Sequence, residues 1–237
     1  MLLDPTELHQ NLDRLEEIER TSLRLVVQAL HDYRAIAQEV FRIESDLVAD
    51  IGEDITREAL DRLGMPRIDQ RLFGKVDYKR ACYLFHPDYT IKQALFVDSK
   101  AEKASGRGTA TLQISQISMA VRQVRFGREI DEPGRLPTVV DLKGSTYLTT
   151  TIFVKYNYLE RGGVKDLVDV AVAALPNGML QERYNPTAVD SIWIAGRNAP
   201  TLGEEFRVRL SLPRLKAKAP WRVQYIPMAP TEFAWDG

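Results

Sequence analysis

The chain has 237 residues, of which 44% are hydrophobic and 27% charged, and its formal net charge at pH 7 is −1. These are ordinary values for a globular protein, and we expect one domain over residues 1–237 with a substantial core. One cysteine, Cys82, excludes an internal disulfide, and with three scattered histidines a structural zinc site is not expected. Without an apolar run of membrane-spanning length or a signal-peptide pattern, we expect a cytoplasmic protein with no membrane partner.

The small net charge hides an uneven distribution along the chain. Residues 1–62 carry 15 acidic and 7 basic residues, a net of −8, whereas residues 63–237 carry 18 acidic and 25 basic residues, a net of +7. Residues 206–225 contain six basic residues and no acidic one, and residues 99–128 contain six basic residues against one acidic residue. Phosphate binding depends on such local fields, so the distribution favours a nucleic-acid partner over two merely solvated basic faces.

The first quarter of the chain has the pattern of helices. Residues 4–7, Asp-Pro-Thr-Glu, resemble a helix start, with Asp at the N-cap and Glu three residues later. Apolar residues recur at helical spacing over residues 23–51, which predicts one long or broken amphipathic helix. Another helix is predicted over residues 54–63, with Gly64 placed to end it. The acidic part, residues 1–64, is therefore helical, and its apolar face should cover a sheet or a second subunit.

Two strands are predicted next, joined by a short turn. Residues 73–85 and the apolar run 94–97, which Asp98 closes, have strand composition, and the polar, proline-containing segment 86–90 lies between the two strands. Successive side chains on a strand point to opposite faces, so Asp98 and Lys100 share one face and Ser99 takes the other. If the strands pair, Asp77 lies beside Asp98.

Two carboxylates and a lysine at a strand end have the composition of a phosphodiesterase site. The carboxylates of Asp77 and Asp98 can bind a hard cation through oxygen, while Lys100 orients the water or offsets charge. Acidic groups at the tip of an apolar strand are costly unless they are paired or metal-bound. The alternative interpretation is a solvated strand end with a cross-strand ion pair.

The rest of the chain is predicted to add a helix and more strands. The glycine-rich segment 102–109 is irregular, residues 111–125 are predicted to be a helix, and residues 127–148 a long loop. Strands are predicted over residues 149–158, 166–175, 191–195 and 206–212. This order predicts an α/β (α+β) protein with a mixed or antiparallel sheet flanked by helices, in which residues 65–237 form the sheet and the nucleic-acid-binding part.

Several short stretches in the same order resemble the type II restriction endonucleases of the SfiI/BglI group. They are LRLVVQAL at 23–30, EDIT at 53–56, VDYKR at 76–80, VDSKA at 97–101, LQISQ at 112–116, QERYNP at 181–186 and PWRVQ at 220–224. The resemblance implies the restriction-endonuclease core of the PD-(D/E)xK nucleases. It also implies Mg²⁺-dependent hydrolysis of double-stranded DNA, with Asp77 and Asp98 as metal-binding acids and Lys100 as the catalytic lysine.

The same resemblance implies the partners and the kind of target. The expected target is an interrupted GC-rich palindrome of the GGCC(N)5GGCC type, and a cognate DNA methyltransferase would protect the host sites. Symmetric cleavage of a duplex needs two active sites related by a two-fold axis, so a homodimer or homotetramer is expected. The backbone carbonyl of Ser99 is expected to complete the Mg²⁺ ligands.

Two regions are candidates for DNA contact. The loop after the active site, with Arg107, Thr109 and Thr111, is the candidate for base recognition, because the arginine fork matches the acceptors of guanine. The basic C-terminal region is a further candidate for base recognition and includes Arg214, whereas Lys216, Lys218 and Arg222 are better candidates for phosphate contacts. For each arginine the alternative is a phosphate contact or a solvated charge.

Other interpretations remain open from the sequence. Glu53 either assists metal binding or favours the positive end of a helix dipole. A repair or junction-cleaving nuclease of the same core would share the site, and a non-catalytic DNA-binding protein would share the basic regions. A helical oligomerisation protein accounts for the acidic first part alone.

Overall fold

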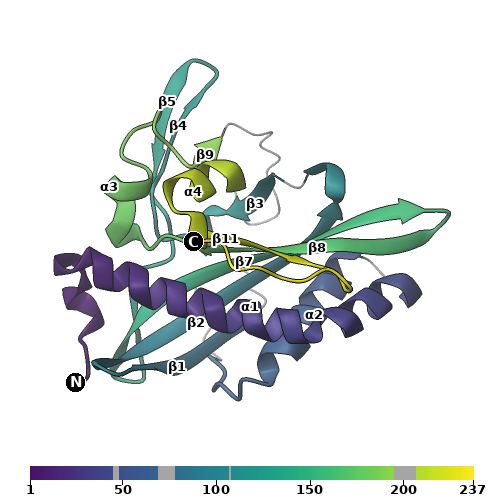
Figure 1. The fold of residues 1–237 in the computed structure, drawn as a ribbon. Helices are drawn as coiled ribbons and strands as arrows, with labels where there is room; N and C mark the ends of the chain where they lie inside the picture. The colour runs from purple at the N-terminus through teal and green to yellow at the C-terminus, as the bar shows by residue number, and fades with distance from the viewer. Residues whose placement is uncertain (45–47, 69–77, 107, 195–206) are drawn as a thin grey trace.

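The computed structural model describes residues 1–44, 48–68, 78–106, 108–194 and 207–237, and its centre is a six-stranded mixed sheet (Figure 1). The strands follow the order β1-β2-β7-β8-β11, and β6 pairs with the beginning of β7. Strands β2 and β7 run parallel, and the other pairs of this sheet are antiparallel. The bounds are β1 Tyr78–His86, β2 Tyr89–Lys103, β6 Val139–Leu142, β7 Ser145–Arg161, β8 Val164–Leu175 and β11 Val223–Pro227.

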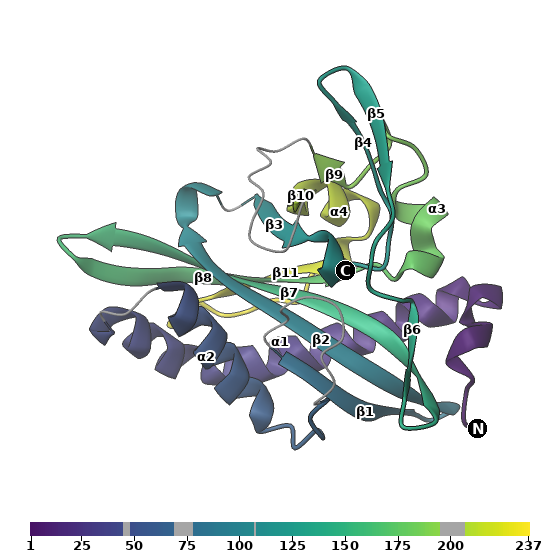
Figure 2. The ribbon, with the colours of Figure 1, turned by 180° about the vertical axis from the view of Figure 1, so that it is seen from behind.

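Helices α1 (Leu12–Ile43) and α2 (Val48–Asp61) lie along one face of this sheet, as Figures 1 and 2 show, and the short 3-10 helix η1 (Pro5–Gln10) lies at the N-terminal end of α1. The ring of Phe41 in α1 stacks on Tyr156 of β7, and the hydroxyl groups of Thr56 in α2 and Tyr156 lie 2.8 Å apart. The long or broken amphipathic helix predicted over residues 23–51 is found as α1, which begins earlier at Leu12, and the first turn of α2. The helix predicted over residues 54–63 is the rest of α2, and the apolar face of both helices covers the sheet.

The opposite face carries the smaller elements, which lie above the central sheet in Figure 1. A second sheet has the order β3-β10-β9, and β4 and β5 form a separate hairpin. The bounds are β3 Thr109–Gln113, β4 Val121–Arg125, β5 Arg128–Glu132, β9 Trp193–Ile194 and β10 Arg207–Ser211. The helical elements are η2 Ala104–Gly106, η3 Ile114–Gln116, η4 Gly178–Leu180, α3 Gln181–Tyr184, α4 Leu212–Lys218 and η5 Pro220–Arg222.

The predicted helix over residues 111–125 is wrong. This segment instead contains β3, η3 and β4. In β3 the buried residues Ala110 and Leu112 alternate with partly exposed threonines, and in β4 the buried residues Val121 and Gln123 alternate with more exposed arginine and valine. Buried and exposed side chains alternate in both short strands, and one turn of 3-10 helix lies between them. Together their apolar residues have a spacing that resembles the pattern of a helix.

The predicted long loop over residues 127–148 is also wrong. It contains β5, β6 and the start of β7. Strand β5 has the polar sequence Arg-Glu-Ile-Asp-Glu and pairs only with β4 among the described residues. A strand of a projecting hairpin contributes little to the core, so it carries no apolar alternation that would identify it.

The remaining strand predictions hold within the described residues. Strands β7 and β8 contain the predicted strands 149–158 and 166–175, while only Trp193–Ile194 and Arg207–Ser211 of the last two predictions are described as strands. The predicted first hairpin is β1 and β2, and the predicted residues 73–77 lie outside the described part. No helix in the described ranges is long and apolar enough to cross a membrane.

Candidate active site

Strand β2 places Asp98 and Lys100 on the face of the central sheet opposite to α1 and α2. Ala101, the residue after Lys100, faces the helices, because its Cβ is 3.5 Å from the position that a Cβ on Gly52 of α2 would occupy. Side chains alternate along a strand, so Lys100 and Asp98 point to the opposite face. In the parallel register with β7, Asp98 is opposite Phe153 and Lys100 is opposite Lys155. The strand register therefore agrees with the prediction that Asp98 and Lys100 share a face.

The carboxylate of Asp98 is buried and held by two side chains. Its side chain is 4% exposed, Lys100 Nζ lies 3.2 Å from Oδ2, and Gln116 Nε2 donates to Oδ1 at 2.7 Å. The buried Oδ2 atom accepts no hydrogen bond of good geometry. Burial raises the pKa of Asp98; the charge of Lys100 and the hydrogen bonds oppose this shift, and the charge of Glu53 adds to it.

The structure does not place the side chains of the other predicted metal ligands, Asp77 and Ser99, beside Asp98. Asp77 lies outside the described residues, although its successor Tyr78 pairs with Val97, the residue before Asp98. The Ser99 side chain is buried on the other face, so its predicted contribution is through the backbone carbonyl alone. Within the described ranges, no group of three His, Cys, Asp or Glu side chains is arranged to hold a metal ion.

Glu53 contributes to the electrostatics of this site from α2. The helix begins at Val48, so Glu53 lies in its second turn and not at its start. The interpretation of Glu53 as a residue at the positive end of a helix dipole is therefore wrong. Its charge acts on Asp98 instead, which makes it an acidic neighbour of the candidate site.

The structure adds one charged residue that the sequence interpretation missed. Lys155 lies in the middle of β7 and is 0% exposed, with Nζ 2.7 Å from Oε2 of Glu102. The signal was a single lysine within the apolar strand Thr-Ile-Phe-Val-Lys-Tyr-Asn-Tyr-Leu, because an unpaired buried ammonium is too costly to be incidental.

Comparison with known proteins decides what kind of chain carries this site. The family model described as type II restriction enzyme SfiI matches residues 21–226. The type II restriction enzyme SfiI of Streptomyces fimbriatus is 35% identical, with 90% of this chain and 84% of that protein covered. The chain belongs to the SfiI family of type II restriction enzymes.

Solved structures agree with this assignment. The crystal structure of tetrameric restriction endonuclease SfiI bound to cognate DNA has a TM-score of 0.84 at 32% identity, covering 98% of this chain and 91% of that chain. Restriction endonuclease BglI bound to its DNA recognition sequence has a TM-score of 0.74 at 17% identity, covering 95% and 94%, and shows the shared fold. The predicted restriction-endonuclease fold is confirmed, and the enzyme is a deoxyribonuclease and not a helical oligomerisation or non-catalytic DNA-binding protein.

The small sheet places two predicted DNA-contacting residues of this SfiI-family enzyme on one strand. Thr109 and Thr111 both lie in β3, opposite Ser211 and Arg209 of β10. Directly opposed residues of an antiparallel pair share a face, so Arg209 and Thr111 point to the same side. Arg209 is one of the six basic residues of segment 206–225, whose pattern alone does not single it out. Arg107 lies outside the described residues.

The C-terminal basic residues bind different groups of the same chain. Arg214 donates to the carbonyl oxygens of Ser191 and Trp193, at 3.1 and 3.2 Å. Lys216 and Lys218 form ion pairs of 2.6 Å with Asp236 and Asp190.

Arg222 is not available to DNA. Its side chain is 0% exposed and lies 2.6 Å from Oε2 of Glu19, which is also 0% exposed. The predicted phosphate contact of Arg222 is therefore wrong, because the guanidinium has a buried carboxylate partner in α1. Sequence reasoning had no means to detect this pair, since its members lie far apart in the chain.

Proposed function

We propose that this enzyme hydrolyses double-stranded DNA at a specific site in the presence of Mg²⁺, with Asp77, Asp98 and Lys100 as its catalytic residues. The observation that carries the proposal is the buried carboxylate of Asp98 beside Lys100, in a chain of the SfiI family. Hydrolysis breaks the bond between phosphorus and the 3′ oxygen, so the products carry 5′-phosphate and 3′-hydroxyl ends.

The chemistry of the donor set fits a hard cation. Oδ2 of Asp98 is buried and accepts no hydrogen bond of good geometry, and its one partner in the described residues is the ammonium of Lys100 at 3.2 Å, so a metal ion would share this oxygen with Lys100. Carboxylate and backbone carbonyl oxygens are the ligands that Mg²⁺ uses, so Asp77, Asp98 and the carbonyl of Ser99 would hold it. When bound, Mg²⁺ supplies charge stabilisation at the phosphate and a more acidic water.

Lys100 is placed to act on the substrate side of Asp98. Its side chain is 34% exposed, whereas that of Asp98 is 4% exposed, so the ammonium can reach a phosphate that approaches from solvent. In the proposed mechanism Lys100 contacts the scissile phosphate and orients the attacking water, which gives up a proton as it bonds to phosphorus. Its charge also offsets the charge that develops on the phosphoryl oxygens.

For recognition we propose an interrupted GC-rich palindrome of the GGCC(N)5GGCC type. Its support is the identity of 35% with SfiI over most of both chains. We assign base recognition to Arg107, Thr109 and Thr111. Lys216 and Lys218 each have one carboxylate partner, Asp236 and Asp190, and Arg214 donates from one nitrogen to two carbonyl oxygens, so each keeps further donors for a phosphate.

We further propose that the enzyme acts as a homodimer or homotetramer, because two symmetric cuts need two active sites. The SfiI structure that resembles this chain is described as tetrameric. A cognate DNA methyltransferase that modifies the same sequence is the expected partner activity, since an unprotected chromosome would be cut.

The test is digestion of phage DNA by the purified enzyme with Mg²⁺, followed by sequencing of the fragment ends. We expect a defined set of ends within one repeated sequence and no cleavage when the divalent cation is chelated. Asp98→Ala should abolish cleavage and keep DNA binding, measured by gel shift with Ca²⁺ in place of Mg²⁺.

The matched control is Asp88→Ala, which removes a carboxylate that is 74% exposed in the turn between β1 and β2. This variant should cut like the unmodified enzyme. Cleavage by Asp98→Ala at near the unmodified rate would refute the assignment of the site, and random fragment ends would refute site-specific cleavage.

A further inference from the structure

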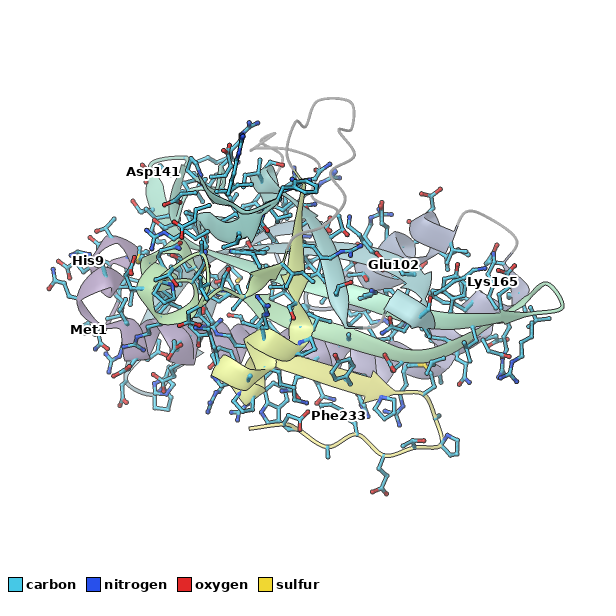
Figure 3. All side chains as sticks on the ribbon, turned by 90° about the horizontal axis from the view of Figure 1, so that it is seen from above. Met1, His9, Glu102, Asp141, Lys165 and Phe233 are labelled. Atoms are coloured by element: carbon cyan, nitrogen blue, oxygen red, sulfur yellow. The ribbon has the colours of Figure 1, made fainter. Side chains whose placement is uncertain are left out.

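Lys155 is a buried cation whose three protons are all used. Besides the contact with Glu102, Nζ donates to the carbonyl oxygens of Gly106 and Thr109, each at 2.6 Å. A lysine ammonium has three donors and no acceptor, so the set of partners is complete. Glu102 is labelled in Figure 3, which looks onto the face of the central sheet that carries the small elements.

The partners of Lys155 connect the catalytic strand to the recognition sheet. Glu102 lies in β2, two residues after Lys100, and Lys155 is the register partner of Lys100 in β7. Gly106 ends η2, and Thr109 begins β3. The two carbonyl oxygens therefore belong to the segment that joins β2 to β3, and they stand on either side of sequence position 107.

Core stability alone does not require a lysine at this position. Replacing a buried ion pair by apolar side chains of similar volume is often neutral or stabilising. Glu102 is 36% exposed and could be solvated without Lys155. What an apolar residue could not do is hold two backbone carbonyls of the β2–β3 segment at fixed positions.

We propose that Lys155 is a positioning residue for sequence recognition, which holds the β2–β3 segment in the shape that presents its side chains to the bases. This inference rests on the proposed function, in which that segment recognises bases. The side chain of Lys155 makes no described contact with the side chains of the proposed metal ligands or of Lys100, and it acts through Glu102, Gly106 and Thr109. Because Glu102 follows Lys100 on the same strand, the same anchor ties base recognition to the position of the catalytic lysine.

The test compares Lys155→Met with the matched control Lys103→Met. Lys103 also lies in this region, at the end of β2, but its side chain is 64% exposed and pairs with Glu160 at the surface. Both variants lose one positive charge by the same substitution. The substrates are a duplex with the sequence found at the fragment ends of the unmodified enzyme, and duplexes with one base pair changed.

The decisive readout is the ratio of kcat/KM on the correct duplex to that on each altered duplex. For Lys155→Met we expect this ratio to fall by about tenfold or more, the size of one base contact, while cleavage still requires Mg²⁺. For Lys103→Met the ratio should be unchanged. An unchanged ratio in Lys155→Met, or an equal loss of rate on all duplexes, would overturn the positioning role.

A second variant covers the case in which Lys155→Met does not fold. Glu102→Ala leaves Lys155 bound to the two carbonyls but cuts its link to β2, so the ratio should fall in the same direction by a smaller factor. An unchanged ratio here would also overturn the proposal. The proposed function itself fails in a different way, because an unmodified enzyme without defined fragment ends would refute it before any variant is compared.

Discussion

Gln116 donates a hydrogen bond from its side-chain amide to Oδ1 of Asp98, with 2.7 Å between nitrogen and oxygen. Gln116 is 2% exposed, and its amide oxygen accepts from the backbone nitrogen of Gln113 at 2.8 Å. Its orientation is therefore fixed from both ends. A buried residue of η3 thus orients the carboxylate that we assign to the metal site.

Replacing this residue should weaken the metal site without removing it. For Gln116→Met we expect cleavage at low Mg²⁺ to fall by about 10- to 100-fold, as for other groups that orient metal ligands, with part of the rate recovered at high Mg²⁺. The measurement is kcat as a function of Mg²⁺ concentration. Gln28→Met, on the exposed face of α1, is the control, and an unchanged Mg²⁺ dependence in Gln116→Met would contradict this role.

Asp98 should destabilise the metal-free protein at neutral pH. Its pKa is raised by burial above the ordinary 3.8, so the folded state disfavours the charged carboxylate. Stability contributed by a group with a raised pKa is complete below the unfolded pKa and is lost as pH rises through the folded pKa. Asp98→Asn, which cannot ionise, should therefore unfold at higher urea than the unmodified protein at pH 8, by about 1 kcal/mol.

This gain should shrink as the pH falls toward the ordinary pKa of an aspartic acid, because the unmodified carboxyl is then protonated as well. Urea denaturation at a series of pH values with a chelator present measures it. Asp88→Asn, in the exposed turn, is the control that removes a carboxylate outside the core, and it should give no comparable gain at pH 8. If Asp98→Asn were less stable than the unmodified protein at pH 8, the pair with Lys100 would outweigh the cost of burial.

The local pattern of the sequence was sufficient for one half of the candidate site. Period-two alternation and an apolar run placed Asp98 and Lys100 on one face of a strand, and the strand register agrees. Gln116 could not be found in this way, because the segment around it was taken for a helix. Its role depends on the 3-10 turn η3, which the apolar content of two short strands concealed.

The buried ion pairs of Lys155 and Arg222 could not be predicted from the sequence, for a different reason. Lys155 and Arg222 are both 0% exposed, yet a lysine and an arginine are assigned to the surface by any composition rule. Glu102 is brought to Lys155 by the pairing of β2 with β7, and Glu19 is brought to Arg222 by the packing of α1 against the sheet. The fold class needed no such detail, since the order of helices and strands predicted a mixed or antiparallel sheet flanked by helices, and the family resemblance implied the mixed sheet.

The buried pair of Glu19 and Arg222 should be important for stability. Both side chains are 0% exposed, and Glu19 also accepts from the backbone nitrogen of Asn177 at 2.7 Å. Burial raises the pKa of Glu19, and the charge of Arg222 opposes this shift. Arg222→Met leaves the carboxylate without its cation, so we expect a loss of about 3–5 kcal/mol in the free energy of unfolding.

Urea denaturation measures this loss, and the double variant Glu19→Leu/Arg222→Met provides the comparison. Removing both charges should restore much of the lost stability, because no unpaired buried charge remains. A double variant as unstable as Arg222→Met would show that packing around the guanidinium, and not the charge pair, is what the fold requires.

Phe126 occupies a conformation that disfavours its side chain. It forms the two-residue turn between β4 and β5 with Gly127, and both residues have positive φ values, 48° and 72°. Phe126 is 92% exposed, and its ring contacts the guanidinium of Arg125, which lies 5.4 Å from the ring centroid, so burial in the core does not compensate for the conformation. Asn tolerates the left-handed region much better than an aromatic residue, and Asn-Gly is a favoured pair in such a turn. Phe126→Asn should therefore raise the free energy of unfolding by about 1 kcal/mol.

The control Phe126→Leu removes the aromatic ring and keeps the backbone penalty, so it should give no comparable gain. The midpoint of urea denaturation, measured for both variants, separates the two effects. An equal gain from both would mean that loss of an exposed ring stabilises the protein, and not relief of the backbone. No gain from Phe126→Asn would mean that the β4–β5 hairpin opens locally before the rest of the protein unfolds. A lower backbone strain in the turn would then leave the free energy of global unfolding unchanged.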